Sequence, residues 1–233
     1  MSVEQNEKHP WSLGRSKEGR LELSVQGAPY GPICADLSSV EVRSSAARSR
    51  RQPLARAVGL ARSAGKVPRV CDATAGLGGD SWLLAALGCE VIALERSETV
   101  FSLLADGLER ARAFAPEICD RIQLLQGDAL EIFANWSERN CGAYPDVVYL
   151  DPMFPPKKKK AALERKEMRA LRSVVGEDTD TSELFEAALK LARQRVVVKR
   201  PLHAESLVSL PAVQGPTVLH KGKSMRYDVY VQV

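Results

Sequence analysis

The chain has 233 residues, of which 45% are hydrophobic and 27% charged, a composition that fits one α/β domain with a sizeable core and a small extra element. Its net charge of +4 is only mildly basic, so any binding of nucleic acid must depend on local patches. No apolar run approaches the roughly 20 residues that a membrane span needs. The five cysteines are scattered without a CxxC pair and the three histidines are dispersed, so we expect a cytoplasmic protein without disulfides, metal or membrane contact.

Residues 1–64 are expected to form an N-terminal extension. Residues 1–19 are polar and predict a loose lead-in. Alternation of apolar and polar side chains over 21–25 predicts a half-buried strand, and residues 33–42 suggest a second short strand. Apolar residues at helical spacing predict an amphipathic helix over 53–64, which Gly65 would end.

An arginine-rich segment lies inside this extension. Residues 43–51 hold four arginines and no acid. Arginine pairs with phosphate through a planar fork of donors, so Arg48, Arg50 and Arg51 are candidate RNA contacts. A solvated linker explains the same composition equally well, and both interpretations stay open on the sequence.

Residues 65–233 alternate between strand and helix patterns. We predict strands over 67–72, 90–95, 121–126, 144–151 and 195–199. Helices are expected over 81–87, 98–114, 128–136, 161–175 and 182–194, and a hairpin over 217–231. Strands that alternate with helices indicate βαβ units and a parallel sheet with helices on both faces. The added hairpin makes this a Rossmann-like, seven-stranded mixed sheet.

A glycine-rich turn follows the first of these strands. Such a turn lets the backbone approach a ligand at a helix N-terminus, and Gly76 and Gly78 are its candidate cofactor contacts. The dinucleotide pattern GxGxxG is incomplete, because Ser81 stands at the third glycine position. Asp72 and Asp80 would repel a pyrophosphate but suit an amine and a sulfonium. S-adenosylmethionine is therefore favoured over NAD, with a purely structural turn as the alternative.

Two further carboxylates end neighbouring strands. Glu95 ends the second strand, about 20 residues after the turn, where a carboxylate can accept hydrogen bonds from ribose hydroxyls. Asp128 follows the third strand, where it can receive an adenine amino group with the Ala129 backbone amide nearby. Asp128 is at least as well explained as the N-cap of the next helix, and both roles are compatible.

The fourth strand leads into Asp151-Pro152-Met153-Phe154. This stretch resembles the [Asp/Asn/Ser]-Pro-Pro-[Tyr/Phe] motif of methyltransferases that modify exocyclic or amide nitrogens, with Met153 at the usual second proline. An aryl amine is a poor nucleophile because its lone pair is delocalised into the ring. Acceptors at Asp151 and the Pro152 carbonyl would localise that lone pair, and Phe154 would stack on the base. A strand that simply ends in a proline-rich turn is the alternative.

The whole set of motifs closely resembles one family, the bacterial small-subunit rRNA (guanine-N2) methyltransferases called RsmJ. The resemblance is carried by the motifs at residues 72–78, 94–96, 147–155, 166–169 and 196–201. It implies methyl transfer from S-adenosylmethionine to N2 of one guanine in 16S rRNA, on the small ribosomal subunit. It also implies cofactor contacts by Gly79, Asp80, Glu95, Arg96, Asp128, Ala129 and Asp151.

Positive charge follows the catalytic motif. Lys157, Lys158 and Lys159 belong to a run of four lysines, and Arg169 lies on the predicted basic helix behind it. Arg200 stands at the end of the fifth predicted strand of the sheet. Beside a base-binding loop we interpret these side chains as RNA contacts, although a charge run is elsewhere usually a solvated face.

The sequence thus predicts a class I methyltransferase domain over 65–233 behind an extension over 1–64, acting on 16S rRNA and not on DNA. Three alternatives remain: an adenine-N6 methyltransferase, a protein-glutamine methyltransferase, and a non-catalytic rRNA-binding assembly factor on the same fold.

Overall fold

The structure is a computed structural model that describes residues 10–40, 42, 49–61, 66–139, 142–152, 174, 180–207 and 215–232. Its central strands are β3 (Val70–Asp72), β4 (Val91–Glu95), β5 (Ile122–Gln126), β6 (Val147–Leu150), β7 (Arg195–Pro201), β8 (Val218–Lys221) and β9 (Met225–Val231). They form one sheet in the order β5-β4-β3-β6-β7-β9-β8. Strands β3 to β7 run parallel, and β9 is antiparallel to both β7 and β8. The predicted seven-stranded mixed sheet with a C-terminal hairpin is confirmed.

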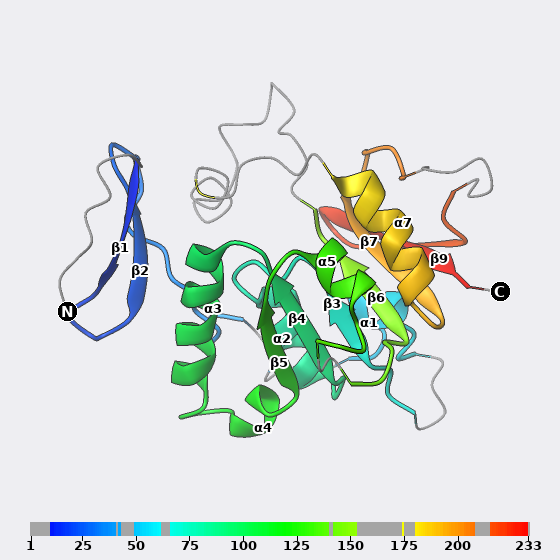
Figure 1. The fold of residues 1–233 in the computed structure, drawn as a ribbon, viewed down its shortest axis with the longest axis horizontal. Helices are drawn as coiled ribbons and strands as arrows, with labels where there is room; N and C mark the ends of the chain where they lie inside the picture. Colours follow the sequence, from blue (N-terminus) through cyan, green and yellow to red (C-terminus); the bar gives the residue numbers. More distant parts are fainter. Residues whose placement is uncertain are drawn as a thin grey trace.

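Helices cover both faces of this sheet (Figure 1). They are α1 (Pro53–Ala57), α2 (Gly79–Ala86), α3 (Glu98–Ala111), α4 (Pro116–Cys119), α5 (Ala129–Ala134) and α7 (Thr181–Leu191). Successive side chains of β6 point to opposite faces of the sheet, as the pleat of a strand requires. Val147 and Tyr149 pack with α1, α2, α3 and α4. Val148 and Leu150 pack with α5 and α7. No helix among the described residues is long and apolar enough to cross a membrane.

The strand order changes direction between β3 and β6. The chain moves outward from β3 to β4 and β5, then returns to place β6 on the other side of β3. In open α/β sheets the crevice at this switch point, outside the carboxyl ends of the strands, is where ligands bind. The glycine turn after β3 and the stretch that begins at Asp151 after β6 start side by side at this edge.

The N-terminal extension contains a separate two-stranded sheet. Strands β1 (Trp11–Arg15) and β2 (Leu21–Val25) pair antiparallel and lie beyond α3 at one end of the molecule (Figure 1). The prediction of a loose lead-in over 1–19 is therefore wrong for residues 11–15. The predicted strand over 33–42 is also wrong, because Ile33 makes only an isolated bridge to Leu23 and no strand follows in the described part of that range.

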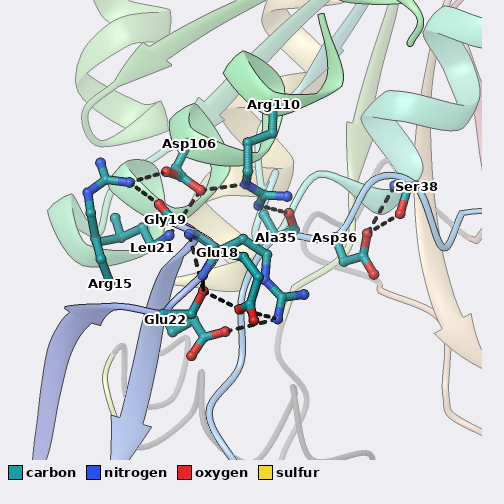
Figure 2. Close-up of polar contacts among 12 residues, drawn as sticks. Arg15, Glu18, Gly19, Leu21, Glu22, Ala35, Asp36, Ser38, Asp106 and Arg110 are labelled. Carbon is teal, nitrogen blue, oxygen red and sulfur yellow. Dashed lines mark hydrogen bonds and ion pairs between the residues drawn. The ribbon is translucent and has the colours of Figure 1, made fainter. Parts of the chain in front are cut away.

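Asp106 on α3 anchors this extension. Its carboxylate accepts hydrogen bonds from the Arg15 guanidinium at 2.9 Å, the Leu21 backbone N–H at 3.2 Å and Arg110 Nε at 2.8 Å (Figure 2). Arg110 also donates to the carbonyl of Ala35 at 2.6 Å. Leu23 packs with α3 in a small apolar cluster. The hairpin of the extension is thus fixed to α3 by the Asp106 carboxylate and by an apolar contact.

Several predicted helices end earlier than their sequence patterns suggest. α1 ends at Ala57, and Gly59 then turns the chain at φ +93°, in the left-handed region that favours glycine. α3 ends at Ala111, and a short new helix begins at Pro116. The helix predicted over 161–175 lies outside the described residues except for position 174, which is helical.

Candidate active site

A cavity of about 590 Å³ opens at the carboxyl edge of the sheet, at the switch point between β3 and β6. A volume of this size is typical of a small-molecule site. Among the residues that the structure describes, its walls carry seven carboxyl groups and two basic groups: Asp36, Asp72, Asp80, Glu95, Asp128, Asp151 and Asp180, with Arg96 and Lys199. Such a surplus of acids favours a cationic ligand over a pyrophosphate.

The glycine turn forms one wall of the cavity. Gly78 is the N-cap of α2 and has φ +80°, in the left-handed region that favours glycine. A Cβ at Gly78 would lie 2.4 Å from Leu104 Cδ1, so the glycine also allows close packing against α3. Gly76 has φ +55° and lines the cavity itself. The turn therefore presents backbone to the cavity at the start of α2, as the sequence predicts.

Glu95 is fixed at the end of β4 by two backbone donors. Its Oε2 accepts from the Gly76 N–H at 3.0 Å and its Oε1 from the Ser97 N–H at 2.8 Å. The residue is 7% exposed and lines the cavity. These two bonds orient the carboxylate at the strand end where ribose hydroxyls are bound in such sheets.

Asp72 lies beneath the glycine turn and is 1% exposed. Ser81 donates its hydroxyl to Asp72 Oδ2 at 2.5 Å, and the Thr74 N–H donates to Oδ1 at 3.2 Å. Burial raises the pKa of Asp72 to about 7, with the nearby Asp80 and Asp151 acting in the same direction against the two hydrogen bonds. Asp72 therefore holds the turn together and changes its charge near neutral pH.

Asp128 and Ala129 border the cavity at the end of β5. Asp128 is the N-cap of α5 and accepts from the Leu130 N–H at 2.8 Å, so the capping alternative is confirmed. Its position on the cavity wall is compatible with a ligand contact as well. Arg96 forms an ion pair with Asp180 at 3.2 Å, which links the end of β4 to the start of α7 across the cavity.

Asp151 lies directly after β6 and is held from two sides. Its backbone N–H donates to Thr74 Oγ1 at 2.7 Å, and its Oδ2 accepts from Lys199 Nζ at 2.9 Å. The same ammonium donates to Asp80 Oδ2 at 2.7 Å, and that oxygen also accepts from the Tyr149 hydroxyl at 2.6 Å. The structure thus joins Asp151 to the glycine turn and to α2.

All the predicted cofactor residues line one cavity except Gly78, whose Cβ position faces Leu104 on α3. Phe154, Arg48, Lys157, Lys158, Lys159 and Arg169 lie outside the described residues. Arg50 and Arg51 are exposed. Arg200 is only 7% exposed and donates to the Glu205 carbonyl. Its guanidinium therefore supports the turn after β7, and we do not carry it forward as an RNA contact.

Several site residues were not predicted. The motif at residues 196–201 assigns no role to Lys199, although this residue shares a face of β7 with buried Val197, and that alternation is a usable signal. Thr74 lies within the glycine-rich turn, and its residue type alone does not mark its hydroxyl as a contact of Asp151. The segment 34–40 also lines the cavity through Cys34, Asp36, Leu37, Ser39 and Val40. No pattern in the sequence marks that segment as part of the site.

Comparison with known proteins gives consistent matches along the chain. The family model described as "Putative SAM-dependent methyltransferase" matches residues 1–232. A protein named "Ribosomal RNA small subunit methyltransferase J" from Pseudomonas fluorescens (strain Pf0-1) is 46% identical over 226 residues, covering 91% of this chain and 80% of its own length. Its namesake from Aeromonas hydrophila subsp. hydrophila is 47% identical over 219 residues, covering 91% and 83%. A solved SAM-dependent methyltransferase from Neisseria gonorrhoeae is similar with a TM-score of 0.69 at 32% identity, covering 98% of this chain and 85% of that one.

Proposed function

Because this chain belongs to the ribosomal RNA small subunit methyltransferase J family of SAM-dependent methyltransferases, we propose that it methylates the exocyclic N2 of a specific guanine in 16S rRNA. A substrate of this kind implies a cytoplasmic enzyme. The observation that supports the proposal most strongly is the position of Asp151. It lies next to the cofactor cavity, and Thr74 and Lys199 join it to residues of the glycine turn and α2.

The residues around the cavity fit S-adenosylmethionine. The cofactor carries a cationic sulfonium and an ammonium group, which match the surplus of carboxyl groups in the walls. Glu95 is oriented by two backbone donors at the strand end where ribose hydroxyls are bound in such sheets. Asp128 and the Ala129 backbone would meet the adenine, and Gly76 and Gly79 would allow close approach at the start of α2, where Gly78 forms the turn. When bound, the cofactor supplies an activated methyl group.

Asp151 and Pro152 would prepare the acceptor amine. The N2 lone pair of guanine is delocalised into the ring, which makes this nitrogen a weak nucleophile. Hydrogen bonds from the amine to the Asp151 carboxylate and the Pro152 carbonyl would localise the lone pair toward the methyl donor. The cofactor would supply the methyl group and leave as S-adenosylhomocysteine, while Asp151 and Pro152 would hold the nitrogen toward it and the amine would release one proton to solvent. Phe154 would stack on the base and fix its plane.

Basic side chains outside the cavity would hold the RNA backbone. Arg50 and Arg51 are exposed near the start of α1, and we propose that they act with Arg48, Lys157, Lys158, Lys159 and Arg169. Phosphate contacts release counterions, so binding should weaken as salt increases. Replacing the seven residues with serine should weaken rRNA binding and flatten its salt dependence. Unchanged binding would show that these charges are only solvated.

We also propose that residues 1–64 form an extension to a methyltransferase domain over 65–233. The extension is not independent of the site, because its segment 34–40 forms part of the cavity wall. Its helix α1 packs on β8 and β9 at the far edge of the sheet. The extension would therefore contribute to cofactor binding as well as to RNA contact.

The experiment that tests the function is mass-spectrometric mapping of small-subunit rRNA from a deletion strain. The strain should lose one N2-methylguanosine, and the wild-type chain should restore it. Asp151→Ala should fold but fail to restore it, whereas the exposed Asp120→Ala should restore it fully. Loss of an N6-methyladenosine or of a protein methylglutamine would support the corresponding alternative enzyme. Full restoration by Asp151→Ala would overturn the catalytic assignment.

A further inference from the structure

Lys199 occupies an unusual place for a charged side chain. It projects from β7 into the cavity wall with only 20% of its side chain exposed. Its ammonium lies 2.7 Å from Asp80 Oδ2 and 2.9 Å from Asp151 Oδ2. One cation therefore bridges an acid of the cofactor side, on α2, and the acid of the base side, after β6.

The surroundings of this bridge are strongly acidic. Asp72 approaches from β3, Asp80 from α2 and Asp151 from the end of β6. Burial alone would lower the pKa of Lys199, but Asp151 and Asp80 outweigh burial and raise that pKa above its ordinary value. Two phenols complete the surroundings, Tyr149 from β6 and Tyr227 from β9. The pKa of each is raised, chiefly by burial and then by Asp80, so both stay neutral.

The bridge affects both the charge and the orientation of Asp151. Like charges within a few ångströms disfavour ionisation, and a protonated Asp151 would carry a donor where the amine needs an acceptor. A cation at hydrogen-bond distance removes this penalty. It also fixes the side chain, because the Asp151 backbone is already tied to Thr74 at 2.7 Å. Because the backbone and the carboxylate of Asp151 are both held, the carboxylate has a defined direction before the base binds.

We propose that Lys199 is a positioning residue, whose ammonium keeps the Asp151 carboxylate ionised and oriented toward the amine that is methylated. This inference rests on the proposed function, because it assigns Asp151 to the amine. Lys199 acts through Asp151 and needs no contact with the base. Asp80 serves as the second anchor of the ammonium, and the Tyr149 hydroxyl holds Asp80 in place at 2.6 Å.

The test compares Lys199→Met and Lys199→Arg with Lys190→Met, which removes an exposed lysine in the last turn of α7. Methylation of small-subunit rRNA is measured from pH 5.5 to 9. For Lys199→Met we expect kcat to fall at least 30-fold at pH 7 while KM for RNA stays within threefold. The acidic limb of the kcat profile should move up by at least one pH unit. Lys199→Arg keeps the positive charge. Its kcat should be a tenth or more of the wild-type value, and the acidic limb of its kcat profile should lie near the pH of the wild-type limb.

A second measurement needs neither cofactor nor RNA. The side-chain carboxyl carbons of aspartate are titrated by NMR in the cofactor-free protein, and the Asp151 signal is identified by its loss in Asp151→Asn. Its titration midpoint should move to higher pH by at least one unit in Lys199→Met and stay in place in Lys190→Met. An unmoved midpoint together with an unmoved acidic limb would overturn the proposal, even if activity fell through loss of packing. Absence of methylation by the wild-type chain would instead count against the proposed function, and the NMR titration would still judge the role of Lys199.

Discussion

The carboxylate of Glu95 accepts a hydrogen bond from the backbone N–H of Gly76 at 3.0 Å. This bond ties the end of β4 to the turn after β3, so the group expected to bind ribose also shapes the glycine turn. The second oxygen of Glu95 accepts from Ser97, the N-cap of α3. One side chain thus couples ligand binding to the geometry of two strand ends.

Glu95→Gln should weaken cofactor binding. A neutral amide has one acceptor oxygen and accepts more weakly than a carboxylate, so the variant would lose hydrogen bonding to the ribose hydroxyls as well as to one of the Gly76 and Ser97 N–H groups. Loss of a hydrogen bond to a charged group costs about 1.5–3 kcal/mol, which corresponds to a rise of roughly 10- to 100-fold in Kd. Calorimetric titration with S-adenosylhomocysteine measures this effect. Glu138→Gln, at an exposed position, is the matched control, and equal affinities for the two variants would contradict the prediction.

Gly78→Ala should destabilise the protein, whereas Gly79→Ala should not. At Gly78 the new Cβ would lie 2.4 Å from Leu104 Cδ1 and the residue would keep φ +80°. Strain and overpacking together are expected to cost roughly 1–3 kcal/mol of unfolding free energy. At Gly79 no atom lies within 4 Å of the added Cβ, and alanine is the better helix former. Urea denaturation of the two variants measures the contrast, and equal midpoints would show that the turn tolerates a side chain at Gly78.

The elements that the sequence predicts well are those with strong local signals. β6 is a short apolar run with every residue buried, and Gly78 and Ser97 mark helix starts through known preferences. The sheet order follows once the strands are known, because parallel crossovers are right-handed and short. Glu95, Asp128 and Asp151 could be placed at one edge for the same reason, since the carboxyl ends of parallel strands meet there.

The parts that were missed depend on contacts distant in sequence. β1 carries few large apolar residues, and it forms because β2 pairs with it and Asp106 binds Arg15 from α3. The cavity wall at 34–40 has no periodic pattern to detect. Lys199 and Asp151 are 48 residues apart, and only the pairing of β6 with β7 brings them together. Such couplings arise from tertiary structure and leave little trace in local composition.

Asp72→Asn should change how stability depends on pH. The pKa of Asp72 is raised from its ordinary 3.8 to about 7 in the folded protein. Between these values the folded chain keeps a proton that the unfolded chain has released, so this group lowers stability as pH rises from about 4 to about 7. Asparagine cannot ionise and resembles the protonated acid. As pH rises through this window, the unfolding free energy of Asp72→Asn should therefore increase relative to that of wild type by up to about 4 kcal/mol.

Urea denaturation from pH 4.5 to 8 measures the difference in unfolding free energy between Asp72→Asn and the wild-type chain. Asp120→Asn, at an exposed position, is the control and should follow the wild-type curve within about 0.5 kcal/mol. If the Asp72→Asn and wild-type curves stay parallel throughout, Asp72 does not change its charge near neutral pH.

Asp106→Ala should release the N-terminal hairpin from α3. The carboxylate is 10% exposed and accepts bonds from Arg15, Leu21 and Arg110 (Figure 2). Burial opposes ionisation of Asp106, but the bonds from Arg110, Leu21 and Arg15 outweigh it and lower the pKa of the carboxyl. Its stabilising effect is therefore present above the ordinary pKa and is lost as pH falls through the lowered value. At neutral pH we expect a loss of about 1–3 kcal/mol.

Hydrogen exchange locates this effect, because amides of β1 and β2 should lose protection while those of β3 and β6 keep it. Asp120→Ala removes a carboxylate whose ion pair with Arg112 is exposed on both sides, at 68% and 51%, so it should have little effect. The cavity wall at 34–40 follows the hairpin and is bound by Arg110 through Ala35. A released hairpin should therefore also weaken binding of S-adenosylhomocysteine. If Asp106→Ala loses hairpin protection but binds this ligand as tightly as wild type, the extension is anchored by Asp106 without supporting the cofactor site.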